Sequence, residues 1–227
     1  MHLAERSAAK CLVFAGEGTK LGANDPVMKL YTHPASPFAR KCRVVAHELN
    51  LKLAEIVVSA RDDESLRRIN PLKKIPILIL DDGSALYDSR VICEYLNNIG
   101  GGKFFPGMTI WRPTSGLWKA LGMQALADGI MDAAVGCRYE RLVPEERQNQ
   151  DHIARHMTTI KAGLDTLERM KFSQTPTIGE VATGCALGYL DFRYPELAWR
   201  EGRPKLAEWF EGFSKFGSMQ ATQPAAQ

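Results

Sequence analysis

The pattern of the chain changes once, at a stretch rich in glycine and proline that begins at residue 100. Before it, over residues 28–99, short apolar runs of strand length alternate with segments that repeat an apolar residue every three or four positions. These segments predict the order strand, helix, strand, helix, strand, strand, helix. Residues 100–116 hold five glycines and two prolines, and every patterned segment after them has the helical period. The chain is therefore predicted to form an α/β domain followed by an all-α domain.

The individual elements follow from the same periodicity. In the first domain we expect a strand at Lys29–Thr32, a helix from Pro37, a strand at Glu55–Val58, a short helix within 62–70, a buried strand within 75–80 and a hairpin turn into Ala85–Tyr87. The last helix of this domain is expected to open at Asp88 and Ser89 and to stop at Gly100, with Val91, Ile92 and Tyr95 on its apolar face. In the second domain we expect a long helix over 117–142, a helix opened by Pro144 that runs to about Met170, a buried helix with the capping box Thr177 and Glu180, and two shorter helices starting at Pro195 and Pro204.

These elements set the expected domain boundaries. Residues 1–27 are predicted to be a flexible N-terminal extension and residues 28–105 the first domain. A linker is predicted over 106–113 and the helical domain over 114–224.

Composition excludes several classes of function. The net charge is only +3 and no basic run is present, so nucleic acid is not an expected partner. No stretch approaches the roughly 18 apolar residues of a membrane span, and no membrane association is expected. The five cysteines are odd in number and form no CxxC pair. Free thiols in a reducing compartment are therefore indicated, and we expect a cytoplasmic protein.

The segment HPASPFARK, residues 33–41, places Ser36 and Pro37 between a strand and a helix. The residues alone leave two interpretations open. Serine is a favourable N-cap and proline suits the first helical position, so the pair can serve only to start the helix. Alternatively, the free N–H donors of the helix N-terminus hold an anionic group, with the Ser36 hydroxyl beside them.

Three motifs occur in a fixed order: SPFARK at 36–41, NPLKKIPILIL at 70–80 and DSRVICEYL at 88–96. With the two-domain order, they resemble the glutathione transferases, from Met28 to about Pro224. ALADGIMDA and ALGYLDFR are most similar to a bacterial branch of that family. The resemblance implies a thioredoxin-like, glutathione-binding domain, an all-helical second domain and a homodimer. It also implies conjugation of glutathione, a co-substrate rather than a cofactor, to a small electrophile, as in detoxification.

The resemblance assigns roles to residues of the first domain. Ser36 is expected to be the catalytic residue that holds the glutathione sulfur, and Phe38 to contact glutathione. The Ile75–Pro76 peptide is expected to be cis, as thioredoxin-like domains carry a cis-proline here, which frees the backbone of Ile75 to pair with a bound peptide. Lys74 would meet a carboxylate or remain a solvated surface lysine. Asp88 and Ser89 open a helix whose N-terminus suits the γ-glutamyl group, or they only cap it.

Two residues of the second domain complete the expected site. Asp128 resembles a family residue that reaches across a dimer to the γ-glutamyl amine, and the alternative is a solvated helix aspartate. Tyr139, about three turns later, either lines the second-substrate pocket or is a plain surface residue. His152 and His156 share a helix face but lack a third ligand, so no metal is expected.

Serine at position 36 bears on the type of chemistry. A serine cannot form a mixed disulfide, which makes disulfide exchange through the protein less favoured. A glutathione-dependent peroxidase or reductase that uses only the bound thiolate remains an alternative. A non-catalytic glutathione-binding module is the other alternative.

Overall fold

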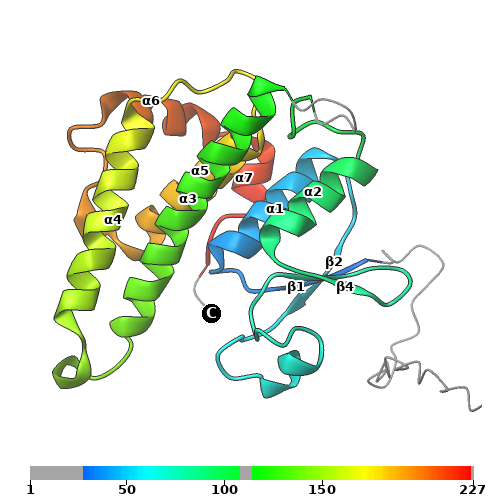
Figure 1. The fold of residues 1–227 in the computed structure, drawn as a ribbon, viewed down its shortest axis with the longest axis horizontal. Helices are drawn as coiled ribbons and strands as arrows, with labels where there is room; N and C mark the ends of the chain where they lie inside the picture. Colours follow the sequence, from blue (N-terminus) through cyan, green and yellow to red (C-terminus); the bar gives the residue numbers. More distant parts are fainter. Residues whose placement is uncertain (1–27, 108–113, 226–227) are drawn as a thin grey trace, which may run out of the picture.

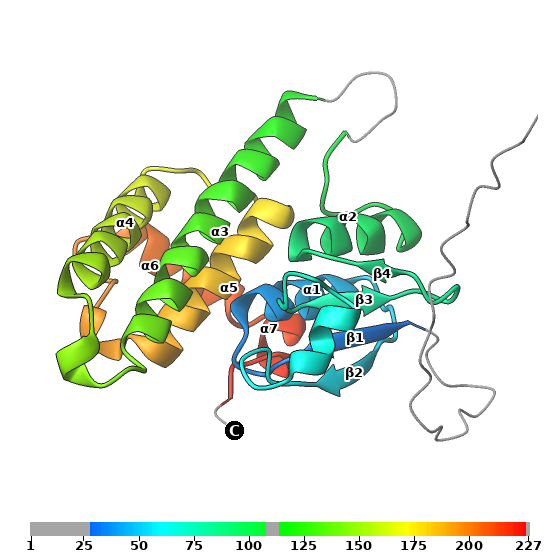
Figure 2. The ribbon, with the colours of Figure 1, turned by 60° about the horizontal axis from the view of Figure 1, so that its bottom comes forward.

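The computed structural model describes residues 28–107 and 114–225. The predicted extension over residues 1–27 therefore lies outside the described residues, and so does most of the predicted linker over 106–113. In the described part, an α/β domain packs along one side of a helical domain, as Figures 1 and 2 show. This arrangement confirms the predicted fold class.

The first domain is built on a four-stranded sheet with the order β2-β1-β3-β4. β1 (Lys29–Thr32) runs parallel to β2 (Ala54–Val57) and antiparallel to β3 (Ile77–Ile79), which pairs in turn with β4 (Ala85–Leu86). α1 (Pro37–Glu48) and α2 (Ser89–Ile99) pack against each other over the sheet, as Figure 2 shows. Their apolar faces bury side chains against the strands, including those of Leu30, Cys42, Leu78 and Ile92.

Most elements of the first domain match the predictions from the sequence. The predicted short helix within 62–70 is a 3-10 helix, η1 (Glu64–Arg68). Val91 was expected on the apolar face of α2, but its side chain is 46% exposed. The buried face of that helix is instead formed by Ile92, Cys93 and Leu96.

The helical domain is organised around α5 (Ile178–Arg193), which is buried over most of its length. Its N-terminus carries the predicted capping box, in which Thr177 Oγ1 accepts from Gly179 N and the Glu180 carboxylate accepts from Thr177 N at 2.8 Å. α3 (Ser115–Glu140) lies between α5 and α4 (Gln150–Glu168), as Figure 2 shows. α6 (Pro204–Phe213) and α7 (Gly217–Ala221) follow, and α7 packs against α1.

One predicted helix start in this domain was wrong. Pro144 does not open α4: it precedes a single 3-10 turn, η2 (Glu145–Arg147), and α4 begins after Asn149, whose side chain accepts from His152 N at 3.0 Å. Pro195 starts a short helix as predicted, the 3-10 helix η3 (Pro195–Leu197). α7 was not predicted. Within residues 28–107 and 114–225, no helix combines the length and apolar character needed to span a membrane.

Candidate functional site

Ser36 lies where β1 gives way to α1. Its backbone N–H donates to the carbonyl of His33 at 2.8 Å, which closes the turn, and its Oγ accepts from Ala39 N at 3.2 Å. Ser36 is therefore the N-cap of α1, with Pro37 in the first turn. The cap bond uses only a lone pair of the hydroxyl, so its hydrogen remains available for an acceptor in front of the helix. The two interpretations of Ser36 are thus compatible.

The loop before β3 is held by a buried asparagine that the sequence analysis missed. Asn70 is 1% exposed, its Nδ2 donates to the carbonyl of Lys74 at 2.8 Å, and its Oδ1 accepts from Leu72 N at 3.0 Å. The Ile75–Pro76 peptide is cis, as predicted. Ile75 precedes the first paired residue of the β1–β3 ladder, so its backbone groups lie outside the pairing of the sheet.

The two lysines of this loop differ in their surroundings. Lys73 pairs with the Glu64 carboxylate and donates to the carbonyl of Arg61 at 2.9 Å. Its ammonium group is therefore already paired within the chain. Lys74 is exposed and has no ion pair within the described ranges. Of the two, Lys74 is the one available to an anionic ligand.

Asp88 and Ser89 open α2 as predicted. Asp88 is the N-cap, and its Oδ1 accepts from Arg90 N at 2.9 Å. Ser89 is buried, and its hydroxyl makes no hydrogen bond to any residue that the structure describes. The carbonyl of Ser89 lies 3.8 Å from Cys42 Sγ, so the first turn of α2 sits beside the second turn of α1. Two helix N-termini thus lie on neighbouring helices of this domain.

The geometry of Asp128 corrects one of the two interpretations of that residue. Asp128 is only 1% exposed. Its Oδ1 lies 2.7 Å from Lys41 Nζ of α1, and its Oδ2 lies 2.8 Å from Arg90 Nε of α2. It is therefore not a solvated helix residue. Its two ion pairs tie α3 to both helices of the first domain, and its role across a dimer stays a prediction.

Asp132, one helical turn after Asp128, is a carboxylate that the sequence analysis did not select. Asp132 as a whole is exposed, but its carboxyl group is partly desolvated and interacts electrostatically with Asp88, Lys74 and Arg90. Partial burial, and then the neighbouring Asp128, raise the pKa of the Asp132 carboxyl. The i, i+4 repeat of aspartate in ALADGIMDA was the available signal, because such residues share a helix face.

The remaining predicted residues occupy different surroundings. Phe38 is partly buried and packs against the hydrophobic core, so core packing accounts for part of its surface. Tyr139 is 53% exposed near the end of α3. His152 and His156 lie with ring centroids 4.5 Å apart, and among the described residues no cluster of three metal-binding side chains occurs.

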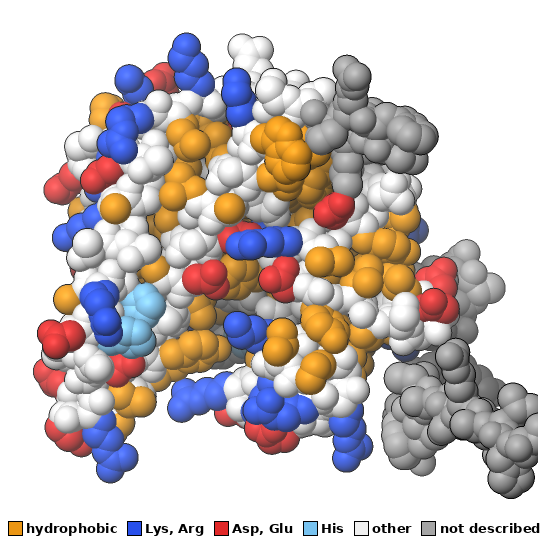
Figure 3. All heavy atoms as spheres, viewed as in Figure 1, with side chains coloured by type: hydrophobic (Ala, Val, Ile, Leu, Met, Phe, Trp, Pro, Cys, Tyr) orange, Lys and Arg blue, Asp and Glu red, His pale blue; other side chains and the backbone are white. Residues whose placement is uncertain are grey.

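Figure 3 shows a hollow between the two domains, with charged side chains along its upper rim. The arrangement offers hydrogen-bond donors at the starts of α1 and α2, the unpaired backbone of Ile75 and the cation of Lys74. Such a set suits an extended ligand that carries carboxylates and a nucleophile.

Comparison with known proteins agrees with this geometry. Residues 30–104 match the model of the glutathione S-transferase N-terminal domain, and residues 150–212 match that of the C-terminal domain. An uncharacterized GST-like protein of Escherichia coli K12, YibF, is 31% identical over 87% of this chain and 98% of its own length.

Solved structures extend the likeness to three dimensions. A glutathione transferase family member from Pseudomonas fluorescens Pf-5, with bound glutathione, is 38% identical with a TM-score of 0.80, over 88% of this chain and 100% of that one. The structure with bound S-(propanoic acid)-glutathione is 36% identical with a TM-score of 0.74, over 87% and 100%.

Both domains, in this order, define a two-domain protein of the glutathione transferase type. The chain belongs to the glutathione S-transferase family and is similar to its bacterial members.

Proposed function

We propose that this protein is a glutathione transferase, which activates glutathione as a thiolate and conjugates it to an electrophilic small molecule. The observation that carries the proposal is Ser36: a hydroxyl at the N-terminus of α1 whose donor hydrogen is not used by the cap bond. The glutathione bound to the Pseudomonas fluorescens relative supports the choice of ligand.

The energetics of activation are consistent with this role. A free thiol with a pKa near 8.5 is only a few per cent ionised at pH 7. Lowering that pKa by about two units takes about 2.7 kcal/mol. The N-terminus of α1 supplies up to about 2 kcal/mol and one hydrogen bond from the Ser36 hydroxyl about 1.5–3 kcal/mol. Together the two effects suffice without a general base.

The rest of the ligand is assigned by charge. We place the γ-glutamyl carboxylate at the start of α2, on the Ser89 hydroxyl and the free N–H groups. Asp88 and Asp132 flank this point and would hold the γ-glutamyl ammonium. The backbone of Ile75 would pair with the cysteinyl residue of glutathione, and Lys74 would meet the glycyl carboxylate.

Two measurements test the proposal. Titration calorimetry should detect glutathione binding, and the bound thiol should show thiolate absorbance at neutral pH. Turnover of 1-chloro-2,4-dinitrobenzene should exceed turnover of peroxides and mixed disulfides. Faster peroxide turnover would identify a peroxidase instead, and binding without thiolate absorbance would identify a non-catalytic module.

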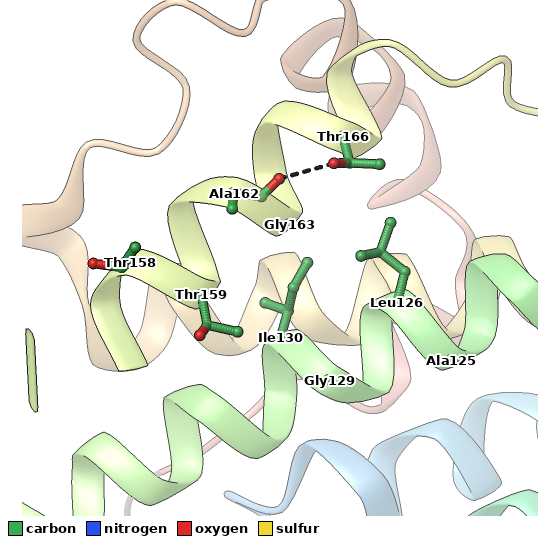
Figure 4. A pocket seen from close by; sticks show the side chains of 9 residues that line it. All are labelled: Ala125, Leu126, Gly129, Ile130, Thr158, Thr159, Ala162, Gly163 and Thr166. Atoms are coloured by element: carbon green, nitrogen blue, oxygen red, sulfur yellow. Dashed lines mark hydrogen bonds between the residues drawn. The ribbon is translucent and has the colours of Figure 1, made fainter. Parts of the chain in front are cut away.

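We also propose that the protein works as a homodimer, in which a groove between α3 and α4 receives the second copy. The groove has a volume of about 490 Å³ and is lined by small residues, among them Gly129, Ala162 and Gly163, as Figure 4 shows. Thr158, Thr159 and Thr166 line it too, but their hydroxyls donate to carbonyls one turn back in α4, so the wall is largely apolar.

Further apolar surface supports the same assembly. Val91 on α2 is 46% exposed and Trp118 on α3 is 60% exposed, and both are large for solvent-facing positions. A symmetric dimer would cover such surface. Cys42, Cys93, Cys137 and Cys185 are buried free thiols, which supports our proposal of a reducing, cytoplasmic location.

A further inference from the structure

A cavity of about 250 Å³ lies between α2 of the first domain and α3 of the second. Its lining residues are Arg90, Glu94, Phe105, Leu121, Gln124 and Ala125. The volume is far more than one water molecule needs, so the cavity has room for a side chain. The polar residues of its wall indicate which kind of side chain it can receive.

Gln124 is the buried polar residue of this wall. It is only 3% exposed, and its Nε2 is buried without a hydrogen-bond partner. A buried amide donor that has lost its bond to water without gaining another is unfavourable for the folded chain. An acceptor brought into the cavity would satisfy this donor.

The two charged residues of the wall are also only partly engaged. Arg90 Nε donates to Asp128 Oδ2 at 2.8 Å, and the two terminal nitrogens of Arg90 donate to no residue that the structure describes. Glu94, one turn later on α2, is exposed and takes part in no ion pair or hydrogen bond within the described ranges. The cavity therefore presents unused donors and an unused acceptor together.

The cavity is continuous with the surface that we assign to the dimer. Ala125 lines both this cavity and the groove between α3 and α4, where Figure 4 labels it. Val91, which is 46% exposed, follows Arg90 on α2. Trp118, which is 60% exposed, precedes Leu121 by one turn of α3. A second copy that filled the groove would therefore reach the cavity as well.

We propose that Glu94 of the partner subunit enters this cavity and accepts hydrogen bonds from Gln124 Nε2 and the free end of Arg90. The inference rests on the proposed homodimer and names the polar contact that holds its two copies in register. In a two-fold dimer the same patch meets itself, so each contact between two residues is made twice. A patch with both unused donors and an unused acceptor is self-complementary in this way. Phe105 and Leu121 would exclude water from the contact, which strengthens a charge-assisted bond.

Removing either member of the contact should weaken the dimer. Glu94→Gln removes the charge at an exposed position, and Gln124→Met removes the buried donor with an apolar side chain of similar length. Each variant should raise the dimer dissociation constant by about tenfold or more, because the two-fold axis repeats the contact. Sedimentation over a dilution series measures this constant, and subunit exchange between two fluorescently labelled samples replaces it for a very tight dimer. Glu146→Gln, at an exposed position of η2, is the matched control and should dimerise normally.

An exchanged pair of residues shows whether the contact crosses the dimer. The double variant Glu94→Gln/Gln124→Glu keeps one amide and one carboxylate but reverses their places. It should form homodimers with itself. Its heterodimer with the native chain sets carboxylate against carboxylate and amide against amide, so heterodimers should form less readily than between two native samples. A contact within one chain would instead give free mixing.

The outcomes separate this contact from the dimer itself. If Glu94→Gln and Gln124→Met dimerise like the native protein, or if the double variant mixes freely with it, the contact is refuted but the homodimer proposal survives. If the native protein is a monomer at micromolar concentration, both proposals fail. Should the double variant not fold, the exposed Glu94→Gln decides, because a normal dissociation constant in that variant refutes the contact.

Discussion

Lys41 Nζ lies 2.7 Å from Asp128 Oδ1, and neither side chain is more than 2% exposed. Burial acts to lower the pKa of Lys41, but the nearby thiol of Cys93 and the carboxylate of Asp128 outweigh it, and the pKa is raised. Asp128 also pairs with Arg90, so one carboxylate joins α3 to both helices of the first domain. The pair therefore ties the two domains together.

Removing this carboxylate should be strongly destabilising. Asp128→Asn leaves the Lys41 ammonium buried without a counter-charge, and the free energy of unfolding should fall by about 3–5 kcal/mol. Urea denaturation measures the loss. Glu211→Gln, which breaks the exposed pair with Lys215, is the control and should cost less than about 1 kcal/mol. Equal losses in the two variants would show that the buried pair has no special role.

Ser36→Ala should separate the two functions of that residue. Loss of the cap bond should lower stability by about 1 kcal/mol. Loss of the hydroxyl donor should raise the pKa of bound glutathione by about one unit or more, because a hydrogen bond to a charged group contributes about 1.5–3 kcal/mol. Less thiolate is then present at pH 7, so turnover should fall there and partly recover at higher pH.

The control for Ser36 is another N-cap. Asn149→Ala removes the cap bond of α4 and should cost similar stability without changing the thiol pKa. Thiolate absorbance against pH is the measurement. Superimposable titrations of the native protein and Ser36→Ala would reduce Ser36 to a helix cap.

Ser89→Ala should weaken glutathione binding by about 1–3 kcal/mol, the cost of a lost hydrogen bond to a carboxylate. Calorimetry measures the change in affinity. Ser84→Ala, in the exposed turn before β4, is the matched serine and should bind glutathione normally. Unchanged affinity in Ser89→Ala would remove the γ-glutamyl carboxylate from the start of α2.

Asp132→Asn should stabilise the free protein and weaken glutathione binding. The pKa of the Asp132 carboxyl is raised in the folded protein, so the folded state disfavours the ionised carboxylate. The native protein therefore loses stability as the pH rises through that pKa. The gain from Asp132→Asn should therefore be present at pH 7 and vanish below about pH 3.9, the pKa of an unfolded aspartate. Unfolding curves between pH 3 and 8 measure it. A gain that persists at low pH would contradict this assignment.

Gly129→Glu should break the proposed dimer without harming the monomer. A Cβ at Gly129 meets no atom within 4 Å, so the fold accommodates a side chain. Replacing a glycine in the interior of a helix should also stabilise the monomer by about 0.5–1 kcal/mol. The charge would fill the α3–α4 groove and oppose association. Gly212→Glu, equally open on α6, is the control and should remain dimeric. Light scattering at micromolar concentration decides, and a monomeric native protein would end the dimer proposal.

The sequence by itself determined the features that local interactions control. Ser36 with Pro37, Asp88 with Ser89, and Thr177 with Glu180 each start a helix as predicted, because a cap is made between residues two or three apart. The order of strands and helices was also predicted, since periodicity reflects which face each element buries. The predicted start of α4 was wrong because two candidate start signals lie close together, and the helix begins after Asn149 rather than at Pro144.

Only the tertiary structure decided the features that join distant residues. Asp128 meets Lys41 across 87 positions of sequence, and no local pattern distinguishes such a buried carboxylate from a solvated one. α7, five residues long, is held by Arg40, which donates to the carbonyl of Met219 at 3.0 Å from 179 positions away. Packing brings these distant groups together, and burial makes their pairing important for stability, because an unpaired buried charge is costly.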